Sequence, residues 1–402
     1  MTDRISGAWL QDPRTIRVMA ALEAARPGGA RFVGGCVRNA LLGRPVDDVD
    51  IATQLKPEQT LDALKAAGIR AIPTGIDHGT ITALVDGQAF EITSLRKDVE
   101  TDGRRAVVTF TEDWREDACR RDFRLNALYA DGTGQIYAPI EGALEDARSG
   151  RIVFIGDAAA RIREDYLRIL RFFRFNAWYG QAIDPAGLAA CTVALDRLND
   201  HVAAERRWVE LTKLLSAPDP SGVLTILEDA GFLEVLFGEQ ARNGVTGLVT
   251  LETRFGMLPD PVRRLMAVIQ ATGSSPDWLS RTYRPSNLTL RRLRSWLEVN
   301  LEGAEVWTGA DWRRALYRFS PEAVCDACVT RCLRGGETDM LRRLLGEVAV
   351  WQRPTLPVSG NDLLARGLRG PVLGGVLQDI EQRWVESDFI LSREALLSSI
   401  PA

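Results

Sequence analysis

The sequence of 402 residues lacks any long run of apolar side chains. A helix that crosses a bilayer needs about 20 consecutive apolar residues, so no membrane-spanning segment is expected. The first residues, Met1 to Gly7, mix acidic and basic side chains and contain no apolar stretch of the kind found in secretion signals. We therefore predict a cytoplasmic protein that has no membrane partner.

Cysteine is also scarce, and the chain has no net positive charge. The six cysteines are scattered along the chain and do not form a disulfide framework, which fits a reducing compartment. The formal net charge of -4 excludes a protein that coats nucleic acid through an overall positive charge. A polyanionic partner would have to bind a local basic surface.

The order of short strands and helices divides the chain into two parts. Strands and helices alternate as far as about Tyr137, and helical spacing of apolar residues dominates from Ala158 onward. This pattern predicts an α+β protein with a mixed head of about 150 residues and a longer helical remainder. The head segments expected are helices at 12–25, 37–42 and 57–67, strands at 30–33 and 46–51, and a hairpin of 80–85 with 88–95 around Asp86-Gly87.

A pair of glycines followed by two aspartates is the strongest local signal. Gly34-Gly35 lies between a predicted strand and a predicted helix, where glycine allows the backbone to approach a phosphate. Arg38, in the first turn of that helix, is placed to bind the same anion. A glycine pair alone is usually only a turn, and an Asp-x-Asp pair alone is usually a solvated loop or strand edge.

Asp48 and Asp50 are expected to lie side by side, because residues two apart on a strand share one face. Two adjacent carboxylates repel each other unless a cation lies between them, and Mg²⁺ prefers such oxygen ligands. Mg²⁺ ions held there would activate an attacking hydroxyl and stabilise a leaving oxygen. Together with the glycine turn, the pair predicts metal-assisted transfer at phosphorus.

Two arginine-rich segments follow, at 120–129 and 163–175. In the second, Asp165, Arg168, Arg171 and Arg174 recur every three residues, which predicts one stripe along a single helix. The simplest interpretation of both segments is a solvated charged surface. An alternative is that Asp165 accepts from an exocyclic amino group while Arg168 donates to a ring acceptor, which selects cytosine and adenine against uracil and guanine.

Four ordered blocks resemble the class II tRNA nucleotidyltransferase/poly(A) polymerase family over roughly residues 30 to 215. These are Gly34-Gly35-x-Val37-Arg38, Asp48-x-Asp50, Arg120-Arg121-Asp122-Phe123-x-x-Asn126-Ala127 and Glu164-Asp165-x-x-Arg168-x-x-Arg171-x-x-Arg174-Phe175. Glu205-Arg206 resembles the start of a further family helix. The resemblance implies a polymerase-β-like nucleotidyltransferase head at 1–150, a helical neck at 151–240 and a helical body and tail at 241–402.

The resemblance also implies an activity and a site. The activity is template-independent addition of C, C and A to tRNA 3′ ends from CTP and ATP, with Mg²⁺ as cofactor. Alternatives within the family are A-only, CC-only or poly(A) addition, and a more distant one is a non-catalytic RNA-binding relative. The implied site residues are Asp48 and Asp50 for catalysis and metal, and Gly35, Arg38, Arg121, Asp122, Asp165, Arg168, Arg171 and Arg174 for the nucleotide.

Several residues depart from the family pattern or match it weakly. Asn39, Arg124 and Ala204 replace the more usual Asp, Thr and Ser, without removing a metal ligand or a base-reading residue. Glu91 is a weaker candidate for a neighbouring carboxylate, and the segment 100–105 with its Gly103 resembles a mobile loop of the family. With only His78 and His201, the chain is not expected to carry the histidine-rich phosphohydrolase domain of some relatives.

Two further clusters lie in the helical half. Cys325, Cys328 and Cys332 share one helix face, and without an evident fourth ligand they are expected to be buried packing residues rather than a zinc site. The basic segments 281–294 and 342–343 are either solvated faces or contacts to an RNA backbone. No obligatory protein partner is expected.

Overall fold

The computed structural model describes residues 3–102, 105–237, 242–272 and 275–400. The chain forms two compact units, residues 1–235 and residues 236–402. The predicted division at 150 and 240 stays a prediction. No helix in the described ranges has the length and apolar character needed to cross a membrane.

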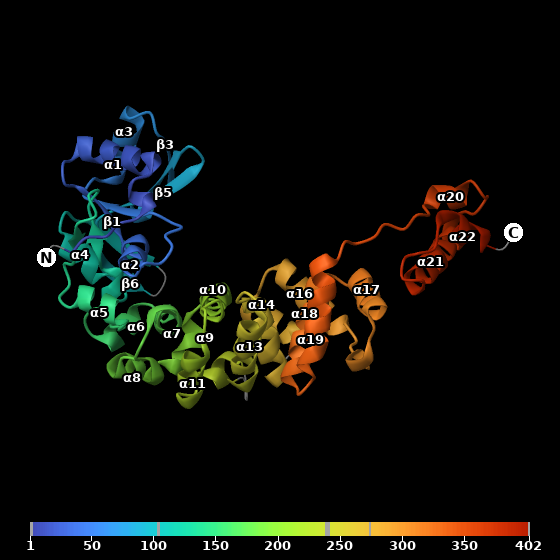
Figure 1. Ribbon diagram of the computed structural model, residues 1–402. Helices are drawn as coiled ribbons and strands as arrows, with labels where there is room; N and C mark the ends of the chain where they lie inside the picture. The colour runs from blue at the N-terminus through green and yellow to red at the C-terminus, as the bar shows by residue number, and fades with distance from the viewer. Residues whose placement is uncertain (1–2, 103–104, 238–241, 273–274, 401–402) are drawn as a thin grey trace. The chain divides into compact units, whose positions relative to one another are not determined.

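A seven-stranded mixed sheet forms the centre of the first unit (Figure 1). Its strands pair antiparallel except for β2 and β5, which run parallel and place Asp50 opposite Glu91. In spatial order the strands are β3 (Arg70–Gly75), β4 (Thr80–Val85), β5 (Gln88–Ser94), β2 (Asp50–Thr53), β1 (Ala30–Val33), β8 (Tyr129–Ala130) and β9 (Ile136–Tyr137). A separate two-stranded sheet consists of β6 (Arg96–Asp102) and β7 (Arg105–Phe110).

The helices of the head begin where the sequence offers capping residues. Helix α1 (Pro13–Ala25) starts after Asp12, whose side chain accepts from the Arg14 N–H, and its first residue is a proline. Helix α1 packs on α3 (Pro57–Ala66); α1 contacts the strands β1 and β4, and α3 contacts β3 and β4 (Figure 1). The predicted helices, the strand at 30–33 and the hairpin are confirmed, whereas the expected loop segment at 100–105 contains residues 103 and 104, which lie outside the described ranges.

The remaining helices of the first unit join the sheet to a helical layer. An aromatic cluster links them: Phe123, from the segment after the arginine pair, packs against Phe154 and against Phe172 and Phe175 of α7. Burial of such side chains contributes about 2 kcal/mol each. These helices are α2 (Gly35–Leu41), α4 (Trp114–Cys119), α5 (Ala143–Ser149), α6 (Ala158–Glu164), α7 (Leu167–Tyr179), α8 (Pro185–Val193), α9 (Leu198–His201), α10 (Ala204–Leu215) and α11 (Ser221–Asp229).

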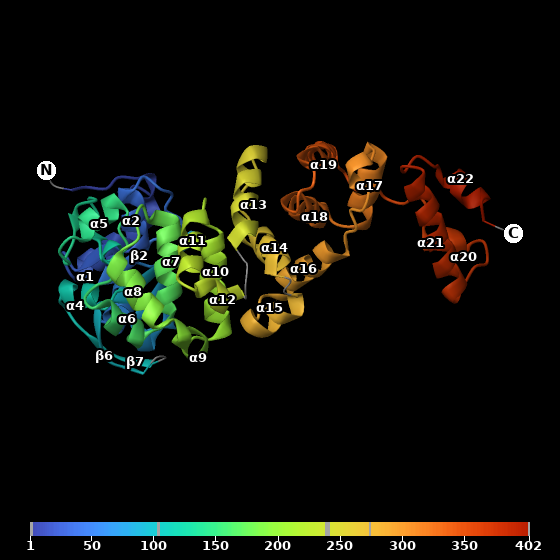
Figure 2. The same cartoon turned by 90° about the horizontal axis from the view of Figure 1, so that it is seen from below.

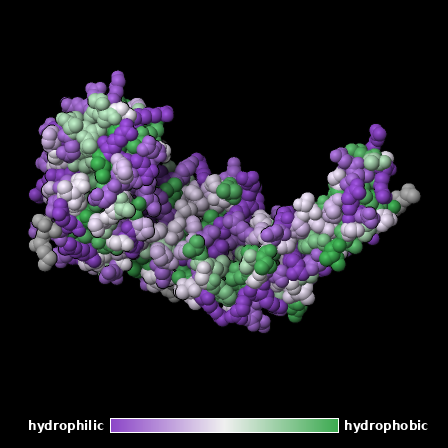
Figure 3. All heavy atoms as spheres, turned by 45° about the horizontal axis from the view of Figure 1, so that its top comes forward, coloured by the Kyte–Doolittle hydropathy of each residue, from purple (hydrophilic) through white to green (hydrophobic). Residues whose placement is uncertain are grey.

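Helices α12 (Phe232–Phe237) to α22 continue the chain, in agreement with the predicted helical remainder (Figure 2). Cys325, Cys328 and Cys332 are buried on one helix, as expected for packing residues. Apolar and hydrophilic residues are interspersed on the visible face in Figure 3. The second-unit helices are α13 (Arg242–Phe255), α14 (Pro261–Thr272), α15 (Pro276–Tyr283), α16 (Asn287–Glu298), α17 (Gly309–Arg318), α18 (Pro321–Leu333), α19 (Thr338–Val350), α20 (Gly360–Leu364), α21 (Gly370–Glu386) and α22 (Arg393–Ser398).

Candidate active site

A turn of two glycines connects β1 to α2. Gly34 has φ 69° and ψ -115°, a conformation in which a side chain would strain the backbone. Its N–H donates to the carbonyl of Leu128 at 3.1 Å, which fixes the turn to the segment that leads into β8. A Cβ at Gly34 would lie 3.5 Å from Nη1 of Arg121. The predicted turn and the predicted arginine, far apart in sequence, are therefore adjacent in the fold.

The two aspartates lie at the start of β2. Asp50 is its first residue and is half-buried, whereas Asp48 precedes the strand and is exposed, so the expected strand 46–51 is wrong at its beginning. Burial raises the pKa of Asp50, and the charges of Glu91 and Asp48 raise it further, while Arg121 opposes them. The negative charges of Asp48, Asp50 and Glu91 therefore repel one another close to the guanidinium of Arg121.

A buried carboxylate that the sequence analysis did not single out holds Arg121. Asp117, on α4, accepts from Nη2 of Arg121 at 3.1 Å and from the hydroxyl of Tyr129 at 2.7 Å, and pairs with Arg120 at 2.8 Å. Burial alone would raise the pKa of Asp117, but Arg121 and Arg120 outweigh it and bring the pKa to about 2. Asp117 is therefore charged and restricts the orientation of Arg121.

Asp122 joins two further predicted arginines. One of its oxygens accepts from Nδ2 of Asn126 at 2.9 Å, and the other accepts from Nε of Arg171 at 2.7 Å. Nη1 of Arg38 in turn donates to the side-chain oxygen of Asn126. Burial raises the pKa of Asp122, but Arg171 and Asn126 together bring it below its usual range. A continuous polar chain thus runs from α2 through Asp122 to α7.

Arg38 is enclosed rather than exposed. Nη2 donates to the hydroxyl of Tyr179 at 2.9 Å, and the guanidinium lies 4.2 Å from the centroid of the same ring. Burial lowers the pKa of Arg38, partly offset by Tyr179. Tyr179 was not identified from the sequence, because its contact with Arg38 joins the end of α7 to α2.

Glu210 is the carboxylate partner of the arginines on α7. It lies 2.7 Å from Nε of Arg174 and 3.6 Å from Nη1 of Arg171, and is buried on α10. Glu210 was missed, although a signal was present: it falls on the same buried helix face as Leu211 and Leu214. A carboxylate at a core position needs a cationic partner.

The segment 163–175 is two helices rather than the single helix predicted. Asp165 has φ -155° and ψ 106°, so the chain leaves helical geometry between α6 and α7. The Asp165 carboxylate accepts from the Leu167 N–H at 3.1 Å and from Nη2 of Arg206 at 2.7 Å. Since it lies between the end of α6 and the start of α7, Asp165 does not belong to the helical stripe.

Arg168, Arg171 and Arg174 do lie together on α7. Nη1 of Arg168 donates to Glu164 at 2.6 Å and to the carbonyl of Arg161 at 2.8 Å. The two residues expected to read a base thus lie at the same junction, but Arg168 is bonded to Glu164 while Asp165 is bonded to Arg206.

Two family models match the sequence between residues 30 and 243. Residues 30–153 match the family described as poly A polymerase head domain, and residues 182–243 match the one described as probable RNA and SrmB- binding site of polymerase A. The chain is 34% identical to CCA tRNA nucleotidyltransferase 1, mitochondrial, of Danio rerio, over 92% of this chain and 86% of that protein. The chain belongs to the CCA tRNA nucleotidyltransferase family. The predicted family and enzyme class are thereby confirmed.

Other members of the CCA tRNA nucleotidyltransferase family agree in length and fold. A CCA-adding enzyme of Streptococcus pneumoniae is 31% identical over 94% of this chain and 95% of that protein. The crystal structure of the Bacillus stearothermophilus CCA-adding enzyme in complex with CTP has a TM-score of 0.73 and 28% identity, covering 94% of each chain. The predicted fold class, a mixed sheet followed by helices, is confirmed.

Nucleotidyltransferases of this family depend on a divalent metal ion. In this chain the donors at the start of β2 are carboxylate oxygens, and the raised pKa of Asp50, caused by its burial and by the charge of Glu91, indicates crowded negative charge that a cation would relieve. In the described part of the chain, no three His, Cys, Asp or Glu side chains form a complete metal site. The residues fit a hard cation that takes its other ligands from water and substrate.

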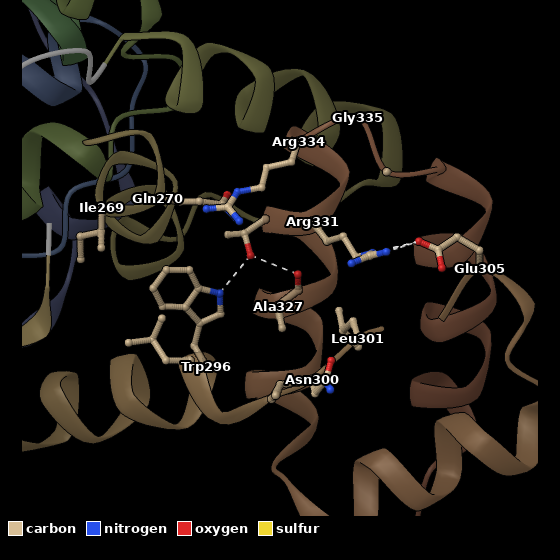
Figure 4. Close-up of a pocket in the computed structure, with 14 residues that line it drawn as sticks. Ile269, Gln270, Trp296, Asn300, Leu301, Glu305, Ala327, Arg331, Arg334 and Gly335 are labelled. Carbon is tan, nitrogen blue, oxygen red and sulfur yellow. Dashed lines mark hydrogen bonds and ion pairs between the residues drawn. The ribbon is translucent and has the colours of Figure 1, made fainter. Parts of the chain in front are cut away.

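A cavity of about 610 Å³ lies in the second unit, between α14, α16 and α18 (Figure 4). In its wall the indole N–H of Trp296 donates to the Thr330 hydroxyl at 2.9 Å, and Arg331 is turned toward Glu305. None of the predicted site residues lines it. The candidate active site belongs entirely to the first unit.

Proposed function

We propose that this protein adds C, C and A to the 3′ end of tRNA, using CTP and ATP, without a nucleic-acid template and with release of pyrophosphate. One observation carries the proposal: Arg121 lies against the Gly34 turn and also acts on Asp50. A cationic group for a triphosphate therefore lies beside the carboxylates suited to a metal ion. The names of the relatives, including one solved with CTP, support the same substrates.

Asp48 and Asp50 are the residues that would hold Mg²⁺. When bound, Mg²⁺ supplies neutralisation of charge that develops on phosphate oxygens and on the attacking hydroxyl. Its preference for carboxylates, waters and substrate phosphates suits a site with few protein ligands. Glu91 lies opposite Asp50 and adds negative charge at this position.

Gly35, Arg38 and Arg121 form the triphosphate side of the site. Arg121 is oriented by Asp117, and Arg38 by Asn126 and Tyr179, so both cations are placed before a substrate arrives. Such preorganisation reduces the entropy lost when the substrate binds. Asp122 is assigned to the ribose side.

Asp165 and Arg168 form the base-reading side, supported by Arg171 and Arg174. A base must replace Arg206 at Asp165 and Glu164 at Arg168. Cytosine and adenine offer an amino donor and a ring acceptor to this pair, whereas uracil and guanine present the reversed pattern and do not compensate for the loss of the two ion pairs. Charged groups left unpaired in a partly buried site are costly, which gives the selectivity.

The 3′ hydroxyl of tRNA attacks the α-phosphorus of the bound nucleotide, the new phosphodiester bond forms, and pyrophosphate leaves. The chain's own residues position the triphosphate and the base, and no side chain beyond the aspartates is assigned as a general base. The described cysteines, all free, suit a reducing compartment, and we place the protein in the cytoplasm.

Three tRNA substrates test the proposal: one that ends at the discriminator base, one with a single added C, and one with two. With CTP alone we expect extension only as far as the second C. ATP alone should extend only the substrate that already has both C residues, and both nucleotides together should complete all three. Incorporation of A on every end would indicate an A-adding or poly(A) enzyme, and arrest at CC with both nucleotides present would indicate a CC-adding enzyme. Binding of tRNA without any extension would indicate a non-catalytic relative.

A further inference from the structure

The buried carboxylate of Asp117 has both of its oxygens engaged. Oδ2 accepts from Nε of Arg121 at 3.3 Å, from Nη2 of Arg121 at 3.1 Å and from the Tyr129 hydroxyl at 2.7 Å. Oδ1 accepts from Nε of Arg120 at 2.9 Å. The side chain is 1% exposed, so these contacts form away from solvent and are correspondingly strong.

The geometry of these contacts determines which nitrogen of Arg121 is directed elsewhere. Asp117 takes Nε and Nη2 of the guanidinium, whereas Nη1 is the nitrogen that lies 3.5 Å from the Cβ position of Gly34. Two hydrogen bonds from one guanidinium to the same charged oxygen restrict the rotation of the guanidinium as well as its position. Nη1 is therefore held toward the glycine turn.

The same carboxylate reaches the base of the β6–β7 hairpin. Oδ1 of Asp117 accepts from the backbone N–H of Arg96, the first residue of β6, at 3.4 Å. The adjacent Glu116 pairs with Lys97 at 3.2 Å and accepts from the hydroxyl of Thr111, just after β7. Both ends of the hairpin base are thus attached to α4, and only Asp117 also contacts Arg121.

We propose that Asp117 is a positioning residue for nucleotide transfer, which directs Nη1 of Arg121 at the triphosphate and joins this guanidinium to the base of the β6–β7 hairpin. The inference rests on the proposed function, because it takes Arg121 as a contact to the nucleotide. It assigns to Asp117 no contact with substrate. The triphosphate is common to CTP and ATP, so both substrates depend on Asp117 equally.

The test is Asp117→Asn, which keeps the size of the side chain and removes its charge. We expect the KM for CTP, with tRNA that ends at the discriminator base, to rise about tenfold. The KM for ATP, with tRNA that ends in CC, should rise by the same factor, while the KM for tRNA stays unchanged. Wild-type KM values for both nucleotides would overturn the inference.

A double-mutant cycle separates positioning from general stability. If Asp117 acts through Arg121, then adding Asp117→Asn to Arg121→Ala produces no further rise in KM. Independent, multiplicative effects of the two substitutions would contradict the proposal. Asp117→Glu, which restores a carboxylate on a longer side chain, should recover part of the lost affinity.

Two further variants keep the test decisive if Asp117→Asn does not fold. Tyr129→Phe removes a single donor to Oδ2, and we expect a rise of about twofold in both nucleotide KM values, absent in the Arg121→Ala background. Glu116→Gln is the matched control, since Glu116 lies on the same helix and holds the hairpin without contacting Arg121; its nucleotide KM values should equal the wild type. Equal effects of Tyr129→Phe with and without Arg121 would refute the inference.

Failure of the inference and failure of the proposed function have different signatures. If the wild-type protein extends none of the three tRNA substrates, the proposed function is wrong. If the wild type extends them and Asp117→Asn retains its nucleotide KM, only the role of Asp117 is wrong.

Discussion

Both units contain buried clusters of arginines and carboxylates, but the balance of charge in these clusters differs. In the second unit three arginines meet three carboxylates: Arg263, Arg264 and Arg292 with Glu252, Asp260 and Asp326. In the first unit five arginines surround three carboxylates: Arg38, Arg120, Arg121, Arg171 and Arg174 with Asp117, Asp122 and Glu210. The second-unit cluster satisfies its own charges, whereas the first-unit cluster lies beside a glycine turn and, through Arg121, beside Asp50. This arrangement suits a triphosphate together with its metal ion.

The comparison shows why a run of arginines does not by itself identify a binding surface. The segment 281–294 was a candidate RNA contact, yet Arg292 within it points inward and bonds Asp260 and Asp326 at 2.8 Å. Arg281, Arg291 and Arg294 are exposed and remain candidates for the predicted contact with an RNA backbone. Only the partners of each guanidinium distinguish the two roles.

The largest effect should follow substitution in the first unit. Asp50→Asn removes a charge from the proposed metal site while keeping a side chain of the same size. We expect the rate of nucleotide addition to fall by at least about 10³-fold, because both the cation and its orientation of the phosphate are lost. Single-turnover extension of tRNA with CTP measures the loss.

Two controls accompany this variant. Binding of tRNA and the temperature of unfolding should stay close to wild type, and chelation of divalent metal should stop the wild-type enzyme until Mg²⁺ is returned. Turnover at the wild-type rate in Asp50→Asn would place the metal site elsewhere.

The second prediction concerns the balanced cluster. Asp326 is fully buried and pairs with Arg263 at 3.0 Å and with Arg292 at 2.8 Å. Asp326→Ala removes the fully buried partner that these two cations share and leaves their charge only partly compensated by Asp260, so we expect the free energy of unfolding of the second unit to fall by about 3 kcal/mol. Denaturant unfolding provides the measurement, and the KM for CTP should not change.

Glu322→Ala is the matched control, since Glu322 also pairs with Arg292, at 3.2 Å, but is 56% exposed. Its removal should cost less than about 1 kcal/mol. If instead Asp326→Ala raised the nucleotide KM at unchanged stability, the distinction between the two clusters would fail.

Local signals account for the parts of the fold that the sequence predicted. The capped helix after Asp12, the glycine turn at Gly34 and the Asp86-Gly87 hairpin each depend on residues within a few positions of one another. The strands β8 and β9 were missed because they consist of two residues each and exist through pairing, β8 with β1 and β9 with β8. Periodicity over so short a segment carries no information.

The candidate site shows the same limit. Arg121 and Arg171 were identified from their motifs, whereas Asp117 and Glu210, which hold them, were not. The break at Asp165 was hidden because the spacing of charged residues continues across it, while the contact with Arg206 that accompanies the break joins distant parts of the sequence. Motifs thus identified the arginines but not the carboxylates that orient them.

The smallest predicted effect is a pH dependence that belongs to Asp117. Its pKa in the folded state is about 2, compared with an ordinary value of 3.8. Because the folded state prefers the charged form, this stabilisation is fully present above about pH 4 and is lost as the pH falls through 2. The difference in pKa corresponds to about 2 kcal/mol, so the free energy of unfolding of the first unit should be higher in wild type than in Asp117→Asn by this amount at pH 7.

Hydrogen exchange at the amides of β1 measures the stability of the first unit by itself. The difference in stability between the two proteins should disappear between pH 4 and pH 2. A stability difference that stays constant with pH would mean that the charge of Asp117 contributes nothing to the fold. The guanidinium groups of Arg120 and Arg121 would then be held in place without a charged carboxylate between them.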